Sequence, residues 1–166
     1  MQLEEFYDYK NLLMKQLCCD PDIVRTVTDN ADAAVPNHDL PYSQVFPYEY
    51  VPETVNDART FICFDTDIVS VPNKTIYCPV IYVWVFTHKS RLRAHGGGCT
   101  LDNLAVAVNN LLNGNRYYGL GELRLDSVRR FKPITDYQGR VLTYYARDFN
   151  RKSGKPDIPR NRKEGI

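Results

Sequence analysis

Two histidines and a cysteine lie close together in the sequence and have the clearest potential for chemistry. His88, His95 and Cys99 are residues of the types that bind zinc. Six residues separate the two histidines and three separate His95 from Cys99, and these spacings match no established zinc motif. No fourth ligand is evident nearby. We therefore expect exposed loop residues here and no metal site.

The same cysteine could also be a nucleophile. Cys99 precedes a segment with a helical pattern, and a helix N-terminus lowers the pKa of a thiol. His95 is close enough in sequence to act as its base, but no orienting acid or nucleophile elbow accompanies the pair. We predict no enzyme activity and no cofactor. A Cys-dependent enzyme stays an alternative, which an acid-shifted reactivity of Cys99 would support.

Two glycine clusters, at 96–98 and 119–121, resemble phosphate-binding loops only superficially. The first lacks the lysine and hydroxyl residue of a Walker motif, and the second leads into a strand pattern. Glycine also permits tight turns, because it adopts positive φ readily. We expect turns at both places.

Basic residues recur in two groups that could neutralise phosphates. The first group, which alternates through the loop after a long apolar run, is Lys89, Arg91 and Arg93. The second, which clusters further along the chain, is Arg129, Arg130 and Lys132. The chain carries a net charge of +1. Residues 151–166 hold six basic and two acidic residues, so the preceding part is mildly acidic. A dedicated nucleic-acid-binding module is therefore only an alternative, which steeply salt-dependent DNA binding would favour.

A long strand and the helix after it must position these loops. Residues 75–86 are apolar on both alternating faces, which predicts a central strand covered on both sides, with a bulge or break at Pro79. Residues 101–112 place leucine, valine and alanine on one helical stripe. We expect Thr100 as the N-cap and Gly114 as the C′ residue of a helix that packs across the sheet.

The remaining elements complete a fold of the α+β class. Helices are expected at residues 3–19 and from Asp20-Pro21 to about residue 27, where aspartate and proline form a typical helix start. Strands are expected at three places, two of them joined by a turn at 136–139: residues 60–69, 119–128 and 140–149. The first should pair antiparallel with residues 75–86 across 71–74. The prediction is an antiparallel β-sheet with N-terminal helices and one amphipathic helix, in the order α-α-β-β-α-β-β.

The segment at 29–57 combines prolines with aromatic residues. Such a composition excludes a long helix, yet its aromatic side chains argue against disorder. We interpret it as extended chain on a surface, either its own or that of a neighbour, and an ordinary packed loop is equally open. Its candidate interface residues are Tyr42, Phe46, Tyr48 and Tyr50.

Length and composition favour a single domain at 1–150 and a basic, flexible tail at 151–166. No run of about 18 apolar residues is present, and the acidic N-terminus lacks the features of a secretory signal. Five irregularly spaced cysteines are expected to be free, buried thiols in a cytosol-like compartment.

From residue 3 to residue 150 the sequence resembles the tail-terminator (tail-completion, or neck) proteins of long-tailed bacteriophages. The similarity rests on five features in order: the N-terminal helix with residues 20–24, the proline-rich run 45–52, the strand end 81–86, the helix 104–114 and the hairpin 135–140. These are similarities of pattern, without a catalytic signature. A head-completion or stopper protein of the neck is the nearest alternative, but many such adaptors are mainly helical.

The resemblance implies a non-enzymatic structural protein of the virion, assembled in the host bacterial cytoplasm. It would form a homo-hexameric ring at the head-proximal end of the tail tube, end tube polymerisation, and contact the tail tube protein and the head-tail connector or stopper protein. It implies no membrane partner, and DNA in the channel could be contacted non-specifically. Besides the aromatic residues above, the candidate interface residues are Lys89, Arg91, Arg93, Arg151, Lys152, Arg160 and Arg162.

Overall fold

The computed structural model describes residues 3–52, 58–68, 79–116 and 121–146. For residues 3–6 it describes the backbone alone. Its order of elements confirms the predicted α+β fold, with one short strand and a 3-10 helix added. In chain order the elements are α1 (Leu3–Cys19), α2 (Pro21–Thr28), β1 (Val45–Phe46), β2 (Thr60–Ile68), β3 (Pro79–His88), the 3-10 helix η2 (Lys89–Arg91), α3 (Thr100–Leu112), β4 (Leu123–Phe131) and β5 (Tyr137–Ala146).

The strands form one sheet in the order β1-β2-β3-β5-β4, so β3 is central as predicted. The pairs β2–β3, β3–β5 and β4–β5 are antiparallel. The two-residue strand β1, which the sequence did not predict, pairs with β2 in parallel. β3 begins at Pro79, where a proline without an N–H is tolerated. The predicted strand residues 75–78 and the turn at 71–74 lie outside the described residues.

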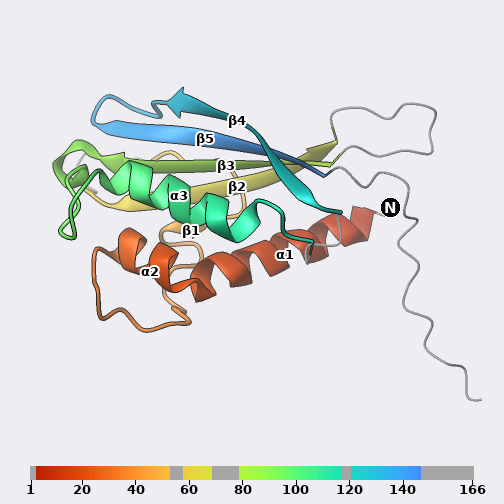
Figure 1. Ribbon diagram of the computed structural model, residues 1–166, viewed down its shortest axis with the longest axis horizontal. Helices are drawn as coiled ribbons and strands as arrows, with labels where there is room; N and C mark the ends of the chain where they lie inside the picture. The colour runs from red at the N-terminus through yellow and green to blue at the C-terminus, as the bar shows by residue number, and fades with distance from the viewer. Residues whose placement is uncertain (1–2, 53–57, 69–78, 117–120, 147–166) are drawn as a thin grey trace, which may run out of the picture.

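The helices α1, α2 and α3 lie together on one side of the sheet (Figure 1). The main core lies between these two layers. It joins Leu13 and Leu17 of α1, the apolar stripe of α3, and alternate residues of β2, β3 and β5 such as Phe64, Val83 and Leu142. Full burial of each large apolar side chain contributes about 1.5 to 3 kcal/mol, so this core holds the helices on the sheet.

The start of α2 follows from Asp20 and Pro21. The Asp20 carboxylate accepts hydrogen bonds from the main-chain N–H groups of Asp22 and Ile23, both at 3.0 Å. Proline occupies the first helical position, where its missing N–H costs nothing. At the other end, Asp29 adopts a left-handed conformation with φ 54° and ends the helix. Both ends of this short helix are therefore well defined.

The start of α3 differs from the prediction. Thr100 is the first helical residue and Cys99 is the N-cap, without a capping side-chain hydrogen bond. The reason is that Thr100 is buried and its main-chain N–H donates to the Leu92 carbonyl at 2.8 Å. At the other end Gly114 has φ +79°, as expected for a C′ residue, and its N–H donates to the Leu123 carbonyl.

The last hairpin was placed wrongly by the sequence. Its connection spans 132–136, and the predicted turn residues Tyr137 and Gly139 belong to β5 instead. Gly139 lies opposite Phe131 and Phe86, and a Cβ there would come within 2.8 Å of the Val85 carbonyl oxygen. At this position glycine therefore permits the close approach of neighbouring strands and does not form a turn. The predicted strand residues 119, 120 and 147–149 lie outside the described residues.

The opposite face of the sheet carries a second, aromatic cluster. Phe46, Phe61, Phe86 and Tyr137 are buried there with Cys63, and Tyr50, Trp84, Phe131 and Ile134 pack against them. Among the described residues no helix lies over this face. The apolar pattern of β3 is thus covered by helices on one face and by aromatic side chains on the other.

The described cysteines are free, as predicted. Cys18 and Cys63 are buried, whereas Cys19 and Cys99 are partly exposed. Burial raises the pKa of Cys18 to about 11 and that of Cys63 to about 12, so both buried thiols stay protonated at neutral pH. Cys78 lies outside the described residues.

Candidate functional site

The loop that follows β3 is attached to its own chain at several points. The Lys89 ammonium lies 2.5 Å from an Asp136 carboxylate oxygen in the last hairpin connection. This contact is exposed, and the hydrogen bond from Lys89 lowers the pKa of Asp136. The ring Nδ1 of His88, the last residue of β3, contacts the hydroxyl of Ser90 in η2 at 2.7 Å. These contacts fix the first turn of the loop.

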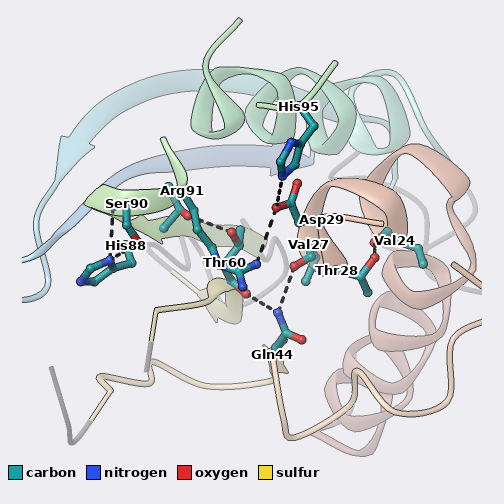
Figure 2. Close-up of polar contacts among 11 residues, drawn as sticks. Val24, Val27, Thr28, Asp29, Gln44, Thr60, His88, Ser90, Arg91 and His95 are labelled. Atoms are coloured by element: carbon teal, nitrogen blue, oxygen red, sulfur yellow. Dashed lines mark hydrogen bonds and ion pairs between the residues drawn. The ribbon is translucent and has the colours of Figure 1, made fainter. Parts of the chain in front are cut away.

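Asp29, at the C-terminal end of α2, attaches the rest of the loop. Its Oδ2 lies 3.2 Å from His95 Nε2 and 3.9 Å from a guanidinium nitrogen of Arg91. Figure 2 shows His95 pointing towards Asp29 and away from His88. Lys89 and Arg91 therefore already face carboxylates of their own chain. Arg93 is exposed, as predicted for a loop residue.

The catalytic and metal-binding alternatives find little support in this geometry. His88 contacts Ser90 and His95 contacts Asp29, so the polar contacts of the two histidines go to residues other than Cys99. In the described parts of the chain, no group of three or more His, Cys, Asp or Glu residues could hold a metal ion. The glycine run before α3 forms a turn in which Gly97 and Gly98 have positive φ. The Asn103 amide donates to the Gly97 carbonyl and holds this turn against α3.

The aromatic segment divides into exposed and packed residues. Tyr42 and Tyr48 are 65% and 45% exposed. Phe46, in contrast, is buried, and Tyr50 stacks on it with 4.1 Å between ring centroids. Of the four aromatic candidates, Tyr42 and Tyr48 are therefore available to a partner, while Phe46 and Tyr50 build the second cluster.

Side-chain hydrogen bonds hold this segment against the helices and the sheet. The Gln44 amide donates to the Val27 carbonyl at 3.0 Å and to the Thr60 carbonyl at 2.9 Å, thereby joining α2 to β2 (Figure 2). Further along, the Lys10 ammonium donates to the Pro47 carbonyl at 3.1 Å. The predicted extended chain therefore lies on the surface of its own protein. Residues 53–57 of the segment are outside the described residues.

The sheet has two exposed ends, and of their residues only Tyr48 was among the candidate interface residues. At one end, β4 exposes Val128, Arg129 and Arg130. At the other, the chain after β1 passes over the aromatic face, where Tyr50 packs on Phe46, and exposes Glu49 and Val51 next to Tyr48. The sequence signal for Arg129 and Arg130 was a basic cluster, but single exposed valines carry no signal before the edge strand is known. The tail candidates Arg151, Lys152, Arg160 and Arg162 lie outside the described residues.

With the fold and these surfaces described, the chain can be compared with known proteins. The model of the YomW family matches residues 13–146, which is most of the chain and includes all the strands of the sheet. The chain belongs to the YomW family. The comparison with curated proteins gave no match.

This YomW protein is also similar to a solved chain described as part of the virion of a native gene transfer agent particle. The two are 20% identical, the match covers 63% of this chain and 78% of the other, and the TM-score is 0.41. Within its described residues, the YomW protein has no helix that is long and apolar enough to cross a membrane.

Proposed function

We propose that the protein is a non-enzymatic structural component of a phage-type virion that forms a ring on the head-proximal end of the tail tube. In this role it ends tube polymerisation and presents a surface to the head-tail connector. Membership of YomW, a phage-derived family, supports a phage origin. The pattern similarity of residues 3–150 to tail-terminator proteins supports the position at the end of the tube.

The proposal of a ring is based on the difference between the two ends of the sheet. The β4 end exposes two neighbouring arginines, and the β1 end exposes a glutamate with a tyrosine. Unlike surfaces at opposite ends of one subunit suit head-to-tail contacts, which close into a ring when the rotation between copies permits. Two identical surfaces would instead suit a two-fold dimer.

The predicted interface loop has a more limited part in this proposal. Lys89 and Arg91 face Asp136 and Asp29 of their own chain, so they are less available to phosphates or to a neighbour. Arg93 and the basic tail keep the role expected from the sequence, which is to contact an adjacent neck or tail protein. A variant that lacks residues 151–166 should fold normally but dock more weakly.

A tube polymerisation assay tests the function directly. Purified tail tube protein is polymerised with increasing amounts of this protein, and tube lengths are measured by negative-stain imaging. The proposal predicts shorter tubes with extra density at one end. Tubes of unchanged length that carry no end density at saturating protein would contradict it.

A further inference from the structure

The β4 end of the sheet combines an apolar residue with two exposed arginines. β4 is an edge strand of the sheet. A bulge lies between Leu125 and Ser127, and the regular stretch after it includes Val128 and the two following arginines. Val128 is 49% exposed. Arg129 lies opposite Val141 and Arg130 opposite Arg140, so the two guanidinium groups point to opposite faces of the sheet.

No carboxylate of the described chain neutralises these two arginines. Arg140 is paired with Asp102 of α3, at 3.3 Å, and Arg124 is paired with Glu122. Among residues 3–52, 58–68, 79–116 and 121–146, neither Arg129 nor Arg130 makes an ion pair. Like charges at successive positions of an edge strand, one on each face, disfavour pairing of that edge with itself.

The other end of the sheet offers the complementary chemistry. Val51 is 43% exposed and Glu49 is exposed, next to the exposed ring of Tyr48. Their position is fixed because Tyr50, between them, stacks on Phe46 of β1. This end therefore presents apolar groups together with a negative charge, whereas the part of β4 after the bulge at Asp126 presents an apolar group with two positive charges.

We propose that the β4 end of one copy, defined by Val128, Arg129 and Arg130, binds the β1 end of the next copy, defined by Tyr48, Glu49 and Val51. The valines and the tyrosine supply apolar contact, and Glu49 pairs with Arg129, the arginine on the face of the sheet that carries the aromatic cluster. Contact of two β4 ends would oppose arginine to arginine, and contact of two β1 ends would oppose glutamate to glutamate. The charge pattern thus selects head-to-tail association over a two-fold dimer. This inference rests on the proposed ring and assigns its subunit interface.

Charge reversal in full-length protein tests the pairing. The double variant R129E/R130E should need a protein concentration about tenfold higher, or more, to form rings on tail tubes. The reason is that like charges then face each other across the interface. Adding Glu49→Arg to the double variant should restore assembly. The matched control Lys15→Glu reverses an exposed basic residue of α1 that belongs to neither surface and should assemble like the wild type. Circular dichroism and thermal unfolding check that all the variants fold.

Two results would overturn the inference while leaving the proposed function intact. One is normal ring formation by R129E/R130E, and the other is a loss that Glu49→Arg does not restore. Wild-type protein that neither forms rings nor shortens tubes would overturn the proposed function, and the interface with it. The two failures are therefore distinguishable.

Crosslinking between introduced cysteines tests the geometry without reference to tube length. In V51C/V128C, a short bismaleimide should link neighbouring copies into a ladder that extends beyond the dimer, because each copy uses two different surfaces. The control V51C/V106C places one cysteine on α3, at a position that is 59% exposed, and should give no ladder above the wild-type background. Crosslinked dimers from V128C, in protein whose partly exposed thiols Cys19 and Cys99 are replaced by serine, would show a two-fold contact and overturn the inference.

Discussion

Replacement of Gly139 by alanine tests the register of the last hairpin, which positions the β4 end. A Cβ at this position would lie 2.8 Å from the Val85 carbonyl oxygen, 2.9 Å from Phe86 Cβ and 3.0 Å from Phe131 Cδ1. The closest of these atoms belongs to the backbone of β3, the central strand, and cannot move without disturbing the β3–β5 pairing. The substitution should therefore strain the sheet itself.

The cost can be placed within a range. Overpacking of a well-packed core costs about 1 to 3 kcal/mol. For a domain of this size, each kcal/mol shifts the Tm by about 2 to 4 °C, so Gly139→Ala should unfold roughly 2 to 12 °C below the wild type. The measurement is thermal unfolding followed by circular dichroism, with urea unfolding to give the free energy.

Gly96→Ala is the matched control, because nothing lies within 4 Å of a Cβ at that position. It should leave the Tm nearly unchanged or raise it slightly, since alanine restricts the unfolded chain more than glycine does. If Gly139→Ala unfolded at the same temperature as Gly96→Ala, the register assigned to β4 and β5 would be refuted.

Further predictions concern single side chains. Gln44→Ala should lower the free energy of unfolding by about 1 to 3 kcal/mol in urea titrations, since two main-chain carbonyls lose their donor, whereas Gln138→Ala on the exposed side of β5 should cost far less. Lys89→Met should destabilise the protein at neutral pH but not in acid. The lowered pKa of Asp136 means that its pairing with Lys89 stabilises the fold above the unfolded-state pKa and is lost as the pH falls through the folded-state pKa; parallel stability curves at all pH values would contradict this. Tyr48→Ala should weaken ring assembly in tube-binding assays more than it lowers the Tm, because its ring is half exposed although it packs on Phe46; an equal loss of both would count against an interface role.

The fold could be predicted where periodicity was strong. The two apolar faces of β3 indicated a central strand, and the helical stripe between Leu101 and Leu112 indicated the helix that crosses the sheet. Both signals come from burial over a long segment, which few alternative structures can satisfy. β1 was missed because a strand of two residues has no period, and its parallel partner β2 lies more than ten residues further along the chain.

Local turn signals misplaced the last hairpin. A tyrosine, a glutamine and a glycine after an aspartate resemble a turn, but Tyr137 is fully buried in the aromatic cluster and Gly139 fits a close strand contact. Tertiary packing determined this region, and no window of local sequence shows which strand a glycine will face. The position of the hairpin in turn determined which arginines reach the sheet edge.

The candidate site was predictable only in part, since its partners are distant in sequence. The basic loop was recognised, but its pairing with Asp29 joins residues more than sixty positions apart and leaves no local pattern. Similarly, Phe46 and Tyr48 looked equivalent in the sequence, yet one is buried and the other exposed. The ends of the sheet became visible only with the strand order.

Native mass spectrometry with negative-stain imaging of the protein, alone and on isolated tail tubes, tests the ring most directly. The account predicts closed rings of six copies, either free or only at one end of each tube. A protein that stays monomeric in solution and leaves both ends of the tubes bare would contradict it.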